Sequence, residues 1–191
     1  MDLIKTLYLQ RHNGVHTGLR RLLEPLSEAQ VRCRPHEAVN TIAWLVWHVA
    51  RAEDIAINRL VTDGVQVLEE RWTEDLNVRI RHFGVGMTPP EVLTLSNQIN
   101  LAAMRGYFDA VRERTVQVVD AMDSETLTEV VDAPYIHKVV YDEGIGGAEA
   151  AYVESVWHDL SRGNYLMYLG LTHSFAHHGE AQTVRSLMGI R

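Results

Sequence analysis

Apolar residues recur every three to four positions along most of the chain. This period predicts amphipathic helices, each with one face turned to a core. Four long segments show it: residues 2–24, residues 40–62, residues 97–122, and a last stretch that starts between 148 and 154 and runs to 188. Pro25 and Gly189 suit the ends of the first and last segments. The pattern therefore predicts an all-α protein.

Polar residues at the segment ends predict where helices start. Asn40 is a good N-cap for the second segment, and Ser27 with Gln30 forms a candidate capping box just after Pro25. A break in the last segment is expected at residues 162–164, where a glycine stands between Arg and Asn.

The connection between the second and third helices is long. Residues 64–96 span 33 positions, too many for a tight turn between antiparallel neighbours. Such a crossover lets helices two and three run in the same direction, which predicts a four-helix bundle in up-down-down-up order. Within it, Thr88 as cap and Pro89 at the first position predict a short helix through Leu95. Either Trp72 or His82 could line the mouth of a pocket, but a packed tryptophan and a solvated histidine are the expectation.

Length and composition narrow the class of protein. The 191 residues fit one domain, residues 1–191, and no apolar run is long enough to predict a membrane span. The net charge of −7 argues against a nucleic-acid partner. The first residues lack the features of a secretory signal, and the single cysteine, Cys33, suits a reducing compartment, so the cytoplasm is the expected location.

The last helix carries the first candidate chemistry. At about 100° per residue, His173, His177 and Glu180 share one stripe, while His178 is turned away from it. Two imidazoles four residues apart on a helix can converge on one cation, although the sequence between them is not that of a zincin. The alternative is a pair of partly buried histidines with ordinary hydrogen bonds. A metal site needs a third ligand.

A third inward histidine lies in the second helix. His48 follows Trp44 and Trp47 in an apolar run and shares its stripe with Thr41 and Ala52, so it should face the core. A buried imidazole must be hydrogen-bonded, neutral or bound to a ligand, and a satisfied core histidine is the alternative to a metal ligand. Two further histidines in the first helix, His12 and His16, fall on the flank of its apolar stripe and are expected at the boundary of the core.

These blocks together resemble the DinB-like four-helix bundle family. The resemblance rests on Ile42–Ala50 around His48, on His173-x-x-x-His177-x-Gly-Glu180, and on the terminal Arg185–Gly189. It implies that His48, His173 and His177 are the ligands of a divalent metal ion. Where many relatives carry Gln, this chain has Glu180, which can be an extra ligand, orient a histidine or act as a catalytic base.

The resemblance also implies a class of reactions. Relatives include enzymes that transfer low-molecular-weight thiols such as mycothiol or bacillithiol, so a metal-dependent thiol transferase with a small-molecule substrate is the first expectation. The alternatives are a metal-dependent hydrolase with Glu180 as base and a non-catalytic metal-binding protein linked to stress. Zinc is the first choice of metal because imidazole suits it, with nickel, iron and manganese as alternatives. Homodimers occur among relatives.

Residues 123–151 carry the weakest helical signal. Pro134 and a glycine-rich turn at 144–147 indicate an ordered loop beside the bundle. Loops next to a rigid site often carry specificity, which makes Tyr135, His137 and Tyr141 candidate substrate contacts. No residue of the sequence identifies the substrate itself.

Overall fold

The protein is built from helices. The computed structural model describes residues 3–69 and 71–190; helix accounts for 72% of the structure, and the described residues hold no strand, only an isolated bridge between Val130 and Ser161. The predicted all-α class is confirmed, whereas the exact up-down-down-up order stays a prediction. The first residue of the predicted helix 2–24 lies outside the described residues. None of the described helices is long and apolar enough to cross a bilayer.

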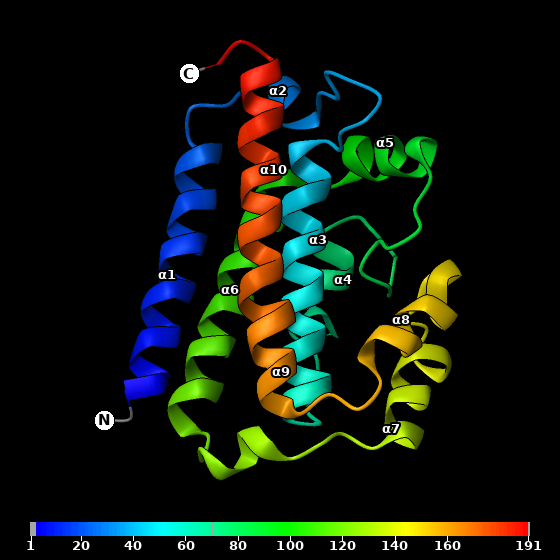
Figure 1. Cartoon of the computed structure of the whole chain (residues 1–191). Coiled ribbons are helices and arrows are strands. Elements are labelled where there is room, and N and C mark those ends of the chain that lie inside the picture. The colour runs from blue at the N-terminus through cyan, green and yellow to red at the C-terminus, as the bar shows by residue number, and fades with distance from the viewer. Residues whose placement is uncertain (1–2, 70, 191) are drawn as a thin grey trace.

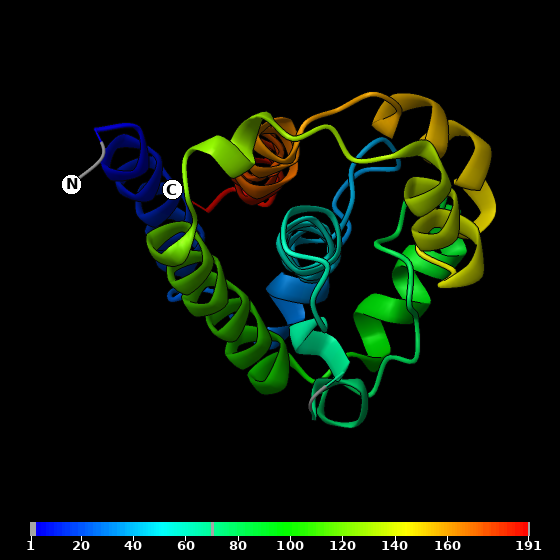
Figure 2. The same ribbon diagram turned by 90° about the horizontal axis from the view of Figure 1, so that it is seen from below.

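Four long helices lie side by side in the described part of the chain, with α3 next to α6 and α10 (Figures 1 and 2). Every residue of α3 is buried, because α6 and α10 pack against one side of it, where side chains of α1 reach Glu53, and the crossover covers the other side. Their bounds are α1 (Leu3–Leu23), α3 (Ile42–Ile55), α6 (Leu101–Ala121) and α10 (His173–Leu187).

Shorter helices connect and extend these four. The α-helical ones are α2 (Glu28–Arg32), α4 (Trp72–Asp75), α5 (Pro89–Gln98), α7 (Ala133–His137), α8 (Ala150–Trp157) and α9 (Arg162–Met167). Within residues 3–69 and 71–190, three segments are π-helical: Ala56–Val61, Lys138–Asp142 and Tyr168–Thr172. Short 3-10 turns span Val67–Glu69, Glu125–Thr128 and Gly147–Glu149. The last π-helical segment joins α9 directly to α10.

Two of the three predicted helix caps are confirmed. Ser27 and Gln30 form the expected capping box of α2, and Thr88 caps α5 with proline at its start. The cap of α3 is Thr41 rather than Asn40, because the Thr41 hydroxyl accepts the Trp44 amide at 3.0 Å. Asn40 is thereby free to point its amide toward α10.

Two predicted helix boundaries are wrong by a few residues. The third long helix starts at Leu101, not near residue 97, because Ile99 leaves the helical conformation and the Asn100 side chain caps the amides of Ala102 and Ala103. The break in the last segment comes before residues 162–164. Ser161 forms a capping box with Asn164 there and starts a new helix, α9.

The crossover is fastened to α3 by a buried carboxylate. Asp54 accepts hydrogen bonds from the backbone amides of Val67 and Leu68, both at 2.9 Å, and from the Tyr107 hydroxyl at 2.6 Å. Arg51 adds an ion pair at 3.2 Å, and all of these groups are buried. This network fixes the start of the crossover against α3 and α6.

The crossover returns to α3 at a glycine. Gly84 has a φ of +100°, and a Cβ there would lie 2.8 Å from the Trp47 ring and 3.1 Å from the Trp44 ring. Only a residue without a side chain lets the backbone come this close to the two indoles. The carbonyl of the preceding residue, Phe83, is thereby brought to His48.

Two glycines of α1 give a controlled test of packing between α1 and α10. Gly14 has open space around its Cα, so Gly14→Ala is expected to raise the free energy of unfolding by about 0.5–1 kcal/mol through helix propensity and a less flexible unfolded chain. At Gly18 a Cβ would lie 2.6 Å from Cε1 of His178, so Gly18→Ala should lose that gain because His178 must move. Urea unfolding of both variants measures the difference; equal stabilisation by both would contradict the packing of His178 on Gly18.

Candidate metal centre

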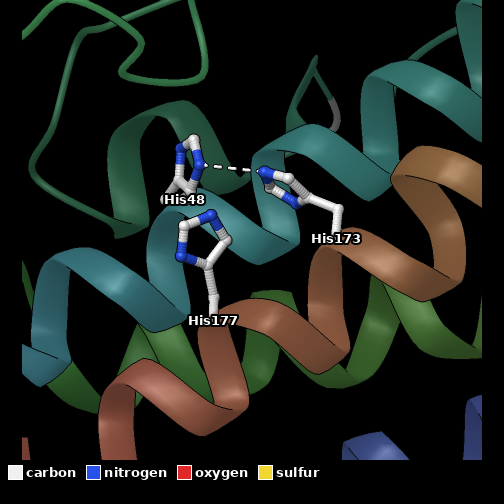
Figure 3. A group of neighbouring side chains, drawn as sticks. All are labelled: His48, His173 and His177. Atoms are coloured by element: carbon white, nitrogen blue, oxygen red, sulfur yellow. Dashed lines mark hydrogen bonds between the residues drawn. The ribbon is translucent and has the colours of Figure 1, made fainter. Parts of the chain in front are cut away.

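Three histidines from two helices meet beside α3. His48 projects from the middle of α3, and His173 and His177 project from the first turns of α10 toward it (Figure 3). The Nε2 atoms of His48 and His173 are 3.1 Å apart, and the three ring centroids are 4.5 to 4.8 Å from one another. One ring nitrogen of each residue lies within 4.8 Å of the other two.

This spacing fits a metal ion. Two nitrogens 3.1 Å apart subtend an angle of about 100° at an ion about 2.0–2.1 Å from each, which is close to the tetrahedral value. Two imidazoles cannot approach so closely unless one ring donates a proton to the other or both bind a cation. The donor set, three imidazoles, suits zinc and other first-row divalent ions.

Two of the three rings form a hydrogen bond through Nδ1, which leaves Nε2 as the atom available to a metal ion. The Nδ1–H of His48 donates to the Phe83 carbonyl, and the Nδ1–H of His177 donates to a Glu180 carboxylate oxygen at 2.9 Å. A neutral imidazole with its proton on Nδ1 carries its lone pair on Nε2, which is the atom that faces the other rings. The third ring, His173, has no Nδ1 partner among the described residues.

Burial keeps two of these rings neutral. Desolvation lowers the pKa of His48 well below its usual range, and the neighbouring His173 and His177 lower it further. Desolvation lowers the pKa of His173, and the neighbouring His177 lowers it further, to about 3. The Trp44 ring stacks on His48 at 4.4 Å and the Phe83 ring at 5.7 Å, and His48 is buried, so water is kept from that ring. Neutral imidazole is the form that binds metal.

The lowered pKa values predict how the metal-free chain responds to acid. An unfolded histidine keeps a pKa near 6.5, so below that pH the unfolded chain takes up protons that the folded chain does not. The free energy of unfolding should therefore fall as the pH drops from about 6.5 to 4.5, by up to about 1.4 kcal/mol per pH unit for each of His16, His48 and His173. Urea unfolding of chelator-treated protein at several pH values measures it. Stability that is constant or rises toward acid would show that these rings are not held neutral.

Glu180 lies behind His177 rather than among the ring nitrogens that converge. Its second carboxylate oxygen accepts the Asn40 amide at 3.2 Å, so α10, His177 and the start of α3 are joined through one carboxylate. The hydrogen bond from His177 lowers the pKa of Glu180, which keeps it ionised. This geometry supports an orienting role for Glu180.

Removing the charge of Glu180 tests that role. Glu180→Gln is expected to weaken metal binding by about 10- to 100-fold, the usual effect of losing a partner of a ligand histidine, while the fold is kept. Asn40→Ala, which removes only the group behind Glu180, should have a smaller effect in the same direction. Gln182→Ala, an exposed change on α10, serves as the control. Competition with a chromophoric chelator measures the affinity, and an unchanged value for Glu180→Gln would contradict the orienting role.

A second group of buried polar residues was not expected. His12 and His16, predicted at the boundary of the core, are fully buried and bind the two carboxylate oxygens of Glu53 at 2.6 and 2.8 Å. The prediction for these histidines is therefore wrong, because α6 covers the flank of α1 on which they lie. A signal was present: Glu53 is one of a few charged residues in the largely apolar second segment, and such a residue needs partners.

Other residues singled out in the sequence lie elsewhere. Trp72 is packed in the core as expected, whereas His82 is half-buried rather than solvated. Tyr135 donates to the Arg59 carbonyl at 2.7 Å, and exposed His137 pairs with Glu154 at 2.9 Å and stacks on Tyr141. Their contact with a substrate stays a prediction.

Comparison with known proteins gives a family and a fold. The family model of the DinB superfamily matches residues 13–181. A crystal structure described as the conserved protein of a locus from Enterococcus faecalis is similar over 99% of both chains, with a TM-score of 0.72 and 18% sequence identity. At that identity the similarity establishes the fold alone. A search of curated proteins gave no match.

Proposed function

Since the chain belongs to the DinB superfamily, we propose that it binds one divalent metal ion through His48, His173 and His177 and acts on a small molecule with a low-molecular-weight thiol. The proposal includes zinc as the metal and the up-down-down-up order of the bundle. The long connection between α3 and α6 supports that order, because it leaves both helices free to run in one direction.

One observation carries the metal part of the proposal. His48 and His177 each donate their Nδ1 proton to a fixed acceptor, so that both Nε2 lone pairs face the space shared with His173. Core histidines that only satisfy their own hydrogen bonds need no common direction. Three imidazoles brought to one point form the ligand set of an open zinc site.

The reaction that we propose is supported by the number of protein ligands to the metal ion. An ion with three protein ligands keeps a position for water or a thiolate and lowers the pKa of the group bound there. The protein's own residues orient the ligands and exclude water on the side of Trp44 and Phe83. Glu180 has both carboxylate oxygens occupied, by His177 and Asn40, which favours orientation over the base of a hydrolase.

Cobalt-substituted protein tests the thiol. Untagged protein loaded with Co²⁺ is mixed with mycothiol, bacillithiol or a simple alkyl thiol, and the near-ultraviolet spectrum is recorded. A new sulfur-to-metal charge-transfer band is expected with a thiol and absent in His173→Ala. Cys33→Ser serves as the control, because Cys33 is the only other source of sulfur ligation by a thiolate and is exposed. Bound cobalt without any such band would reject the thiol and leave hydrolysis of esters and amides to be assayed.

A further inference from the structure

The group formed by His12, His16 and Glu53 lies on the other side of α3 from the metal centre. His12 and His16 come from one face of α1, four residues apart, and Glu53 comes from α3. Glu53 follows His48 by five positions, which turns it by about 140° and moves it about 7.5 Å along the helix axis. The two groups share no residue, so an ion in one does not need the other.

The three side chains present donor atoms to a common point. The Nε2 atom of His12 is 2.6 Å from one Glu53 oxygen and the Nε2 atom of His16 is 2.8 Å from the other. One donor atom of each lies within 4.8 Å of the other two. The Thr115 hydroxyl from α6 donates to Glu53 at 2.6 Å and fixes the carboxylate. Two imidazoles and one carboxylate are a known ligand set for first-row divalent ions.

Charge favours a cation here. Burial would raise the pKa of the Glu53 carboxyl, but the neighbouring His16 and His12 hold that pKa far below its usual range, so Glu53 stays ionised. Burial lowers the pKa of His16, which favours its neutral form. The site is closed by the rings of Tyr8 and Phe108, which stack on His12 and His16 at 5.7 and 4.3 Å. An ionised carboxylate in such a place is stabilised by any cation that its neighbours can also bind.

We propose that His12, His16 and Glu53 form a second divalent-cation site, weaker than the first. It is weaker for two reasons that the contacts show. Each Nε2 already makes a hydrogen bond to Glu53, which an ion must replace. In addition, neither Nδ1 has a partner among the described residues, so no acceptor fixes these rings in the metal-binding tautomer. All three side chains are buried, so we also expect slow loading.

Zinc stoichiometry tests the site without altering it. Chelator-stripped, untagged protein is dialysed against a series of buffered free Zn²⁺ concentrations, and bound zinc per chain is measured by elemental mass spectrometry. Two equivalents are expected, filled in two steps. His173→Ala, which leaves the second group untouched, should keep one equivalent, filled at the higher zinc concentrations. His158→Ala, a change at an exposed histidine, should keep both.

Glu53→Gln assigns the second equivalent. It keeps the shape of the side chain and should bind one equivalent, with circular dichroism to confirm folding. If the native chain saturates at one equivalent and His173→Ala binds none, the second group is a hydrogen-bonded cluster and the inference is overturned. If instead the native chain binds one equivalent that survives His173→Ala and is lost in Glu53→Gln, the second site stands and the first metal site fails.

Discussion

Alanine at His173 is expected to lower the affinity of the first site for zinc by a factor on the order of 10² to 10³, and alanine at His48 or His177 should do the same. A structural zinc site with four ligands binds with about 10–16 kcal/mol, so each ligand contributes roughly 3 kcal/mol. Elemental mass spectrometry of untagged protein, dialysed at a free zinc concentration that fills only the stronger step, measures the loss.

The neighbouring His178 is the matched control for this loss. It follows His177 directly but packs on Gly18 of α1, away from the other three rings. His178→Ala should therefore keep the full first equivalent. A native chain that binds no zinc after reconstitution, or ligand variants that bind as much as the native chain, would reduce the three histidines to core residues.

The second large effect is expected at Asp54. Asp54→Ala removes the acceptor of two backbone amides and of Tyr107, and it leaves the buried Arg51 without its carboxylate partner. Breaking a buried ion pair by removing one partner costs about 3–5 kcal/mol, a large share of the stability of a domain this size. Urea unfolding of the metal-free protein measures the change.

An exposed carboxylate of the same crossover provides the comparison. Asp75 has about half of its side chain exposed, and its ion pair with Arg71 is long, at 3.6 Å. Asp75→Ala should therefore change the free energy of unfolding by less than about 0.5 kcal/mol. Hydrogen exchange at Val67 and Leu68 adds a local readout, because their amides should lose protection in Asp54→Ala. A loss of stability below about 1 kcal/mol would show that the Asp54 network does not fasten the crossover.

The sequence alone showed which side chains within one helix share a face, because they recur at helical spacing. The phase of His173 and His177 follows from helix geometry, and the position of His48 among tryptophans indicates that it is buried. The all-α class follows in the same way from the apolar period. In each case the information lies within a few residues of the position concerned.

Contacts between distant segments could not be placed in this way. The partners of Glu53 lie some 40 residues earlier, on a helix whose flank is covered by α6, and no local pattern shows which flank is covered. Asn40 could be recognised as a capping residue, but Thr41 beside it is an equally good cap, and the choice depends on Glu180 at the other end of the chain. Both cases depend on tertiary packing, which outweighs local preference.

The π-helical segment Tyr168–Thr172 has a consequence for how this stretch can evolve. A π-helical turn closes one residue later than an α-helical turn, so the segment holds about one residue more than an α-helix of the same rise. Loss of a single residue would let it close as an α-helix with nearly the same rise and turn, so α9 would keep its orientation relative to α10. Buried Tyr165 and Leu166 would then stay in the core. Natural variants should therefore tolerate the loss of one residue in this stretch, whereas the loss of a second residue would turn α9 by about 100° relative to α10.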